Sequence, residues 1–192
     1  MLAGRAFAPL RAALENAGIR YAIGGSWAST AFGEPRFTHD VDIVAELTQE
    51  NLNRLFDELP RDFYGDPQEA RNALRLGRPF NLIYIPLAFK FDLFPTRAFP
   101  LGKEELDRAV YWEGSGLSDL PTPFVSPEDI LLAKLHWYRS GGEVSEVQWR
   151  DIHGIVRGRG PTLDRNYLKH GASRLGVTEL LKRALGDVSP GA

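Results

Sequence analysis

The segment Gly24-Gly25-Ser26 has the residue types of a phosphate-binding turn. It follows a short apolar run, Ile19 to Ile23, that is typical of a strand, and it precedes a stretch of small residues, Trp27 to Phe32, for which Ser26 suits the N-cap of a helix. A glycine turn between a strand and a helix lets backbone N–H groups face an anion without a side chain in the way. The segment therefore predicts an anion site at a helix N-terminus.

Two aspartates follow in Asp40-Val41-Asp42-Ile43. In a strand, alternation places both aspartates on one face and both apolar residues on the other, with the aspartates about 6.6 Å apart at Cα. Two unit charges at roughly 6 Å repel by about 3 kcal/mol at an effective dielectric constant of 20. A divalent cation offsets this repulsion, and Mg²⁺ prefers carboxylates together with substrate phosphates. Alone, the triplet favours an edge strand with solvated aspartates; the glycine turn upstream shifts the interpretation to a metal site.

A third carboxylate, Asp92, lies in the β-rich run Phe89 to Phe94, where Lys90 shares its predicted strand face. A buried carboxylate is costly unless it is paired or binds a metal. Asp92 is therefore expected either at an exposed sheet edge or beside the aspartate pair.

Three other residues are candidates for contacts to phosphate. Arg36 and Thr38 precede the aspartate pair and could reach a phosphate, although a loop arginine is often simply solvated. Lys134 lies in the apolar stretch Ile130 to Leu135, where a buried ammonium needs a partner. That partner would be a phosphate or Asp151.

Composition sets the class of protein. The chain has 192 residues, 43% of them hydrophobic, which is enough for an α/β core with a helical extension, and we expect an α/β region over 1–125 and a helical region over 126–188. A net charge of −2 gives no global basic field for nucleic acid. There are no cysteines, and no apolar run is long enough to cross a bilayer. A cytoplasmic protein without a membrane partner is expected.

Periodicity and capping residues predict the elements that position these side chains. Strands are expected over 19–23, 40–44, 80–85 and 89–94, the last two as antiparallel neighbours. The polar segment 61–77 is expected to be a loop that contains one short helix, 67–76. Helices are expected over 2–17, 27–32, 48–59, 67–76, 102–110, from 127, and over 146–158, 163–175 and 178–185.

The glycine turn, the Asp40-Val41-Asp42 strand and Asp92 on a later strand occur in the order of a known motif. In these three elements the chain resembles the nucleotidyltransferase superfamily, which includes DNA polymerase beta and the antibiotic nucleotidyltransferases. Further on, the chain resembles the helical half of small bacterial members, including toxin-like nucleotidyltransferases of abortive-infection systems, in Ser126-Pro127-Glu128-Asp129, Lys134 and Arg150-Asp151. It departs from them in a longer insertion, Ser140 to Trp149, before Arg150. The resemblance covers most of residues 19–156.

The resemblance implies a polymerase beta-like mixed sheet with flanking helices, and transfer of a nucleoside monophosphate from an NTP such as ATP to an acceptor. It implies a two-ion Mg²⁺ site whose ligands and catalytic residues are Asp40, Asp42 and Asp92, with Asp92 as the base for an acceptor hydroxyl. The residues expected to contact the nucleotide are Gly24, Gly25, Ser26, Arg36, Thr38 and Lys134.

The acceptor is left open by the sequence: RNA such as tRNA, a protein or a small molecule would each suit. The alternative is a non-catalytic binding protein of the same fold, acting as an antitoxin-like or regulatory partner of a cognate toxin or antitoxin. The complete set of three aspartates favours the enzyme.

Overall fold

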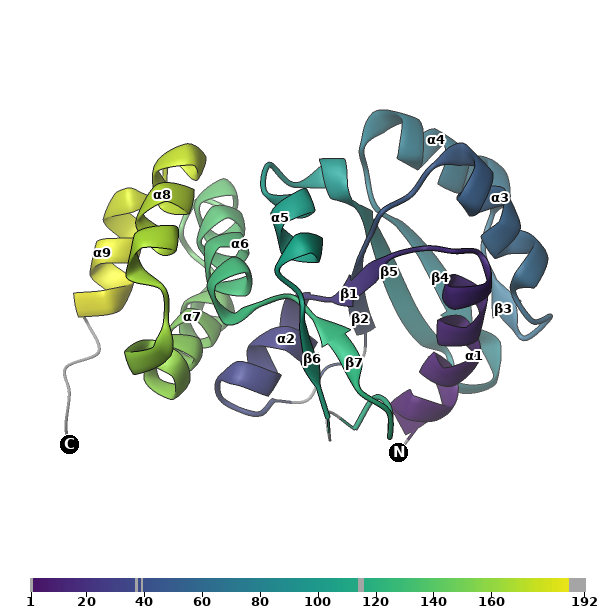
Figure 1. Ribbon diagram of the computed structural model, residues 1–192, viewed down its shortest axis with the longest axis horizontal. Helices are drawn as coiled ribbons and strands as arrows, with labels where there is room; N and C mark the ends of the chain where they lie inside the picture. Colours follow the sequence, from purple (N-terminus) through teal and green to yellow (C-terminus); the bar gives the residue numbers. More distant parts are fainter. Residues whose placement is uncertain (1, 37, 39, 114–115, 187–192) are drawn as a thin grey trace. The chain divides into compact units, whose positions relative to one another are not determined.

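The chain groups into two compact units in a computed structural model that describes residues 2–36, 38, 40–113 and 116–186 (Figure 1). The sheet unit comprises Met1–Gly24 and Thr38–Val125, and the helical unit comprises Gly25–Phe37 and Ser126–Ala192. In this division one boundary falls after residue 125, and residues 25–37 group with the helical unit. No helix in the described part of the chain is long and apolar enough to span a membrane.

The sheet unit is built on a mixed sheet that has, within the described residues, the strand order β3-β4-β5-β2-β1-β7-β6. Strand β2 pairs in parallel with β5, and β1 pairs in parallel with β7, while the other neighbours are antiparallel. The strands are β1 Tyr21–Ile23, β2 Asp40–Ala45, β3 Phe63–Tyr64, β4 Phe80–Tyr84, β5 Phe89–Pro95, β6 Val110–Trp112 and β7 Thr122–Phe124.

The two faces of the central strands differ, as the alternation predicted. Val41, Ile43, Phe91 and Leu93 are fully buried on one face of β2 and β5. Helix α1 (Leu2–Asn16) covers this face, because the ring of its buried Phe7 lies 6.3 Å from the ring of Phe91. The aspartates of both strands therefore lie on the opposite face.

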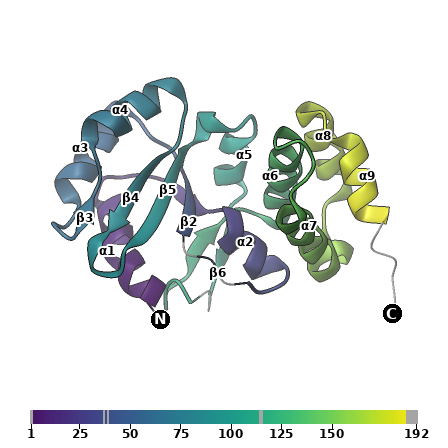
Figure 2. The same ribbon diagram turned by 180° about the vertical axis from the view of Figure 1, so that it is seen from behind.

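Helices α1, α3 (Gln49–Glu58) and α4 (Pro67–Leu76) pack beside the strands, as Figures 1 and 2 show from opposite sides. Thr48 caps α3 in a capping box with Asn51, which confirms the predicted start. The remaining helix of this unit is α5 (Gly102–Asp107), and short 3₁₀ turns, η1 (Ile85–Leu87) and η2 (Thr96–Ala98), follow β4 and β5.

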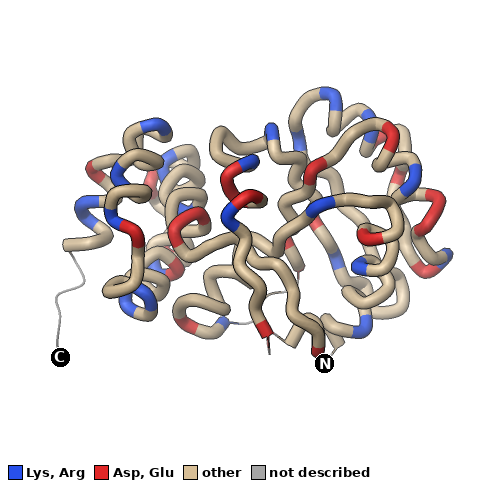
Figure 3. Tube along the Cα trace, in the orientation of Figure 1, with Lys and Arg blue, Asp and Glu red and all other residues tan. Residues whose placement is uncertain are grey.

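The helical unit contains helices predicted from their caps and periodicity. Ser126 and Ser145 accept hydrogen bonds from the backbone N–H groups of Asp129 and Gln148, so both are N-caps as expected. The helices are α2 Gly25–Phe32, α6 Pro127–Ser140, α7 Glu146–Arg159, α8 Arg165–Leu175 and α9 Thr178–Gly186, with the 3₁₀ turn η3 Gly160–Thr162. Basic and acidic residues are interspersed in each unit (Figure 3).

Glycines set the distance between the end of α2 and α7. A Cβ atom built on Gly33 would lie 2.7 Å from the carbonyl carbon of Gly154, and one on Gly158 would lie 2.6 Å from the carbonyl oxygen of Phe32. Such distances are shorter than atomic contact permits, so the two backbones meet without side chains between them.

Three predictions about elements were wrong. Ser26 is not an N-cap, because α2 already begins at Gly25, whose φ of 51° lets the chain turn directly from β1 into the helix. The helix expected over 102–110 ends at Asp107, and Val110 begins strand β6. Strands β3, β6 and β7 were missed because each has only two or three residues and depends on pairing with a neighbour rather than on its own periodicity.

Candidate active site

Three aspartates and a lysine form an acidic cluster on one face of β2 and β5: Asp40, Asp42, Lys90 and Asp92. In the parallel register Asp42 lies opposite Asp92, and Asp40 lies opposite Lys90. Residues opposite each other on neighbouring strands point to the same face, so the fold brings the Asp40–Asp42 pair beside Asp92. All four side chains are partly exposed.

Lys90 connects the carboxylates of this cluster. Its Nζ lies 2.7 Å from Oδ2 of Asp92 and 3.8 Å from Oδ2 of Asp40. The hydrogen bond with Asp92 raises the pKa of the Lys90 ammonium, and the charges of Asp92, Asp40 and Asp42 raise it further, against the opposing effect of partial burial. Sequence reasoning placed Lys90 on the face of Asp92 but gave it no role, because its distance from Asp40 depends on the strand register.

Thr38 belongs to the acidic cluster through a hydrogen bond. Its hydroxyl donates to Oδ1 of Asp40 at 2.7 Å. The sequence interpretation assigned Thr38 to phosphate. In this structure its described partner is the Asp40 carboxylate, which it holds in one orientation.

The glycine turn joins the two units through the backbone. Within the sheet unit, the N–H of Gly24 donates to the carbonyl oxygen of Asp42 at 2.9 Å, so Gly24 continues the pairing of β1 with β2. The next residue, Gly25, is the first of α2 in the helical unit. An added Cβ on Gly24 would make only ordinary contacts, whereas Gly25 needs glycine for its positive φ.

A second set of predicted residues meets in the helical unit, around Asp151 of α7. We call Ser26, Arg36, Lys134 and Asp151 the Asp151 cluster. Nζ of Lys134 lies 2.8 Å from Oδ2 of Asp151, and Nε of Arg36 lies 3.1 Å from its Oδ1. Arg36 also donates a hydrogen bond to the hydroxyl of Ser26.

Charge and burial distinguish the Asp151 cluster. The side chain of Asp151 is only 5% exposed and that of Lys134 only 12%. One carboxylate faces two cations, so the cluster carries an excess positive charge beside a serine hydroxyl in the first turn of a helix. Such an arrangement suits an anion. The sequence named Asp151 as a structural partner of Lys134 but did not connect it with Arg36, because Arg36 and Asp151 are far apart in the chain.

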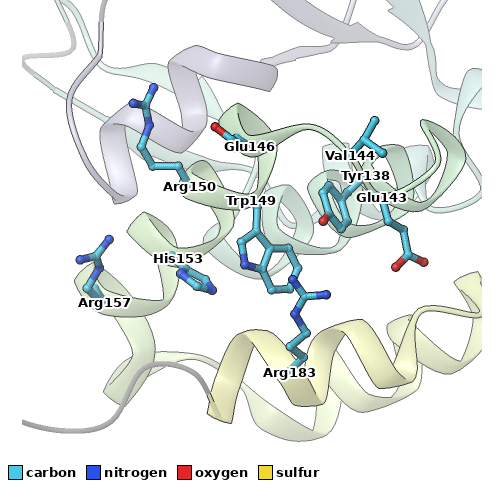
Figure 4. Close-up of a pocket in the computed structure, with 9 residues that line it drawn as sticks. All are labelled: Tyr138, Glu143, Val144, Glu146, Trp149, Arg150, His153, Arg157 and Arg183. Carbon is cyan, nitrogen blue, oxygen red and sulfur yellow. The ribbon is translucent and has the colours of Figure 1, made fainter.

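A cavity of about 430 Å³ lies elsewhere in the helical unit, with side chains from α6, α7 and α9 around it (Figure 4). The indole of Trp149 is at its centre, with the guanidinium of Arg183 stacked 4.0 Å above the ring. The Tyr138 and His153 rings lie 5.0 and 5.1 Å from Trp149. None of these residues belongs to the Asp151 cluster.

The acidic cluster has the donor chemistry of a magnesium site, because carboxylate oxygens on one sheet face are hard ligands. Within the described ranges, no three His, Cys, Asp or Glu side chains are already gathered to hold a metal ion. The Lys90 ammonium contacts both Asp40 and Asp92 in this structure.

Comparison with solved structures identifies the architecture. An antigenic nucleotidyltransferase-like protein from Paracoccidioides brasiliensis aligns with a TM-score of 0.55 at 19% identity, over 95% of this chain and 92% of its own. ANT(2")-Ia in complex with adenylyl-2"-tobramycin aligns with a TM-score of 0.51 at 15% identity, over 96% of this chain and 98% of its own. The chain has the nucleotidyltransferase fold.

This fold agrees with the resemblance found in the glycine turn and the aspartates, and it confirms the mixed sheet with flanking helices and a helical C-terminal part. No family model matches the sequence, and a search of curated proteins finds no match. The nucleotidyltransferase fold therefore occurs here in a chain that is only 15–19% identical to these two structures.

Proposed function

We propose that the protein is a magnesium-dependent nucleotidyltransferase that moves a nucleoside monophosphate from an NTP to an acceptor. The observation that carries this proposal is the register of β2 and β5, which puts Asp42 opposite Asp92 with Asp40 on the same face. Three carboxylates on one sheet face repel one another, and a cation bound among them offsets that repulsion. The nucleotidyltransferase fold supports the same reaction class.

In this proposal Asp40, Asp42 and Asp92 would hold the metal. Bound Mg²⁺ would supply Lewis-acid stabilisation of the charge that develops on phosphoryl oxygens. Thr38 orients Asp40 by its hydrogen bond. Asp92 would also accept the proton of the acceptor hydroxyl, which makes the acceptor oxygen a better nucleophile toward the α-phosphorus. As the new oxygen–phosphorus bond forms, the bond from the α-phosphorus to the α,β-bridging oxygen breaks, and pyrophosphate leaves.

The Asp151 cluster binds the phosphates of the NTP. Arg36 and Lys134 supply positive charge, and Ser26 supplies a hydroxyl in the first turn of α2, where backbone N–H groups of Gly25 and Ser26 have no partner within the helix. Asp151 keeps both cations in place without neutralising them fully. We therefore assign Asp151 as a positioning residue.

The test is transfer of label from each α-³²P NTP, with Mg²⁺, to total RNA, to cell lysate protein and to an aminoglycoside panel. The aminoglycoside arm is included because ANT(2")-Ia was solved with adenylyl-2"-tobramycin. We expect label in one acceptor class with wild-type protein and none with Asp42→Asn. Absence of transfer to all three, with nucleotide binding retained, would contradict the enzyme and favour a binding protein of the same fold, such as an antitoxin-like partner.

A further inference from the structure

Lys90 stands among the carboxylates that we assign to the metal. We propose that its ammonium is an internal counter-ion of the acidic cluster, which a divalent cation has to displace before it can bind Asp92 and Asp40. This inference rests on the proposed function, because it concerns the same carboxylates. It adds a residue that controls when the metal binds.

The geometry shows why the two cations exclude each other. Oδ2 of Asp92 accepts a hydrogen bond from Nζ of Lys90 at 2.7 Å. A Mg²⁺ ion bound to the same oxygen would lie about 2.1 Å from it. Both cations would then share one oxygen at close range and repel each other strongly. The Lys90 side chain therefore has to rotate away when the metal arrives.

The partly exposed position of Lys90 permits that rotation. Its side chain is 44% exposed, so it can reach water without passing through the core. The same ammonium contacts two of the carboxylates, with Nζ 2.7 Å from Oδ2 of Asp92 and 3.8 Å from Oδ2 of Asp40. Once the ammonium has left, the carboxylates repel one another, and a bound metal cation relieves that repulsion.

Lys90 also affects whether the metal binds alone or together with the nucleotide. With Lys90 in place, a metal alone gains little from the cluster, whereas a metal that arrives with nucleotide phosphates brings further ligands. Lys90 should therefore make metal binding depend on the nucleotide. Without Lys90, the metal should bind well by itself.

The experiment measures Mn²⁺ binding by isothermal titration to wild-type protein, Lys90→Met and Lys103→Met. Lys103 is an exposed lysine on α5 of the same unit and controls for the loss of one surface charge. We expect Lys90→Met to bind Mn²⁺ about three- to tenfold more tightly than wild type, which is the range of a partly exposed ion pair and its neighbouring charges. Lys103→Met should bind as wild type does.

A second measurement uses wild-type protein and so does not depend on a variant that folds. Acetylation of lysines by an N-hydroxysuccinimide ester, followed by peptide mass spectrometry, should modify Lys90 severalfold faster at a Mn²⁺ concentration that the titration shows to saturate wild-type protein, because the ammonium has then been displaced. The rate at Lys103 should not change. Equal rates at Lys90 without Mn²⁺ and at saturating Mn²⁺ would overturn the inference.

The outcomes separate this inference from the proposed function. If Lys90→Met bound Mn²⁺ no more tightly than wild type, while Asp42→Asn lost binding, Lys90 would not compete but the metal site would stand. If Asp42→Asn bound Mn²⁺ as well as wild type, the assigned metal site would be wrong. If neither wild type nor Lys90→Met bound Mn²⁺, both would be overturned.

Discussion

The acidic cluster of the sheet unit and the Asp151 cluster of the helical unit use the same residue types in opposite proportion. On the sheet, three aspartates surround one lysine, and the side chains are partly exposed. In the helical unit, a lysine and an arginine surround one aspartate that is almost completely buried. The sign of the excess charge decides the ligand that each cluster suits, a cation on the sheet and an anion among the helices.

Burial adds a second difference. Removing a carboxylate from the exposed cluster relieves repulsion, whereas removing the carboxylate from the buried cluster leaves two cations facing each other. Loss of an aspartate from the acidic cluster should therefore leave the free energy of unfolding nearly unchanged but lower the rate of nucleotide transfer. Loss of Asp151 should instead lower the free energy of unfolding.

The largest effect is expected on activity when Asp42 is changed to Asn. Loss of a metal ligand should lower nucleotide transfer by about a thousandfold, since a bound metal contributes several kcal/mol and each 1.36 kcal/mol is tenfold in rate. The free energy of unfolding should stay within about 0.5 kcal/mol of wild type or rise. Transfer assays and urea unfolding measure the two quantities.

The control for this variant is Asp57→Asn, at an exposed aspartate on α3. It removes the same charge away from the cluster and should leave transfer unchanged. If Asp42→Asn transferred nucleotide at the wild-type rate at saturating Mg²⁺, the acidic cluster would not hold a catalytic metal. The contrast between a cation site on the sheet and an anion site among the helices would then be wrong.

The next effect concerns stability in the helical unit. Asp151→Asn should lower the free energy of unfolding by about 3 kcal/mol, because Lys134 is left buried without its carboxylate. The double variant Asp151→Asn, Lys134→Met should recover part of this loss. Denaturant unfolding measures the stability of both variants. A loss of unfolding free energy below about 0.5 kcal/mol in Asp151→Asn would show that the Lys134–Asp151 pair does not stabilise the cluster.

A third prediction separates the ligands of the two clusters. Lys134→Met should weaken binding of a non-hydrolysable ATP analogue by about tenfold, since a charge-assisted hydrogen bond is lost. Mn²⁺ binding without nucleotide should stay at the wild-type value. Lys169→Met, at an exposed position on α8, serves as the control. Equal losses of analogue and Mn²⁺ affinity in Lys134→Met would remove the distinction between the clusters.

The smallest effect is expected at a residue on the buried face of the sheet rather than on its acidic face. Tyr21 in β1 packs edge-on against the ring of Phe7, and burial raises the pKa of its phenol to about 12 from an ordinary value of 10.0. Between these values the unfolded chain loses the proton and the folded chain keeps it, so stability falls as pH rises. From pH 9 to 11 this group should remove about 1.4 kcal/mol.

Tyr21→Phe provides the measurement, because it removes the ionisable group and keeps the ring. Its unfolding free energy should fall less steeply between pH 9 and 11 than that of wild type. Parallel curves for the two proteins would show that the phenol ionises equally well in the folded and unfolded chains.

Much of the fold could be predicted from local signals. Serine and threonine caps marked the starts of α3, α6 and α7, and alternation gave the faces of β2 and β5. The three short strands could not be predicted, since their hydrogen bonds come from distant partners.

In the candidate site, too, contacts between distant segments could not be predicted from local signals. Aspartates two residues apart on one strand could be placed on one face from spacing alone. The contact of Lys90 with Asp40 and that of Arg36 with Asp151 could not, because each joins segments that only strand register or helix packing brings together.

The glycine contact between the end of α2 and α7 also has a genetic consequence. Every missense change at a glycine codon introduces at least a Cβ atom, and at Gly33 or Gly158 that atom would overlap the backbone of the facing segment. Ser26 and Arg36 flank this contact in the chain, and Asp151 lies on the facing helix. We therefore expect a mutational scan to recover hypomorphic alleles at these two codons, in which a single methyl group weakens nucleotide binding although no residue that contacts the nucleotide has changed.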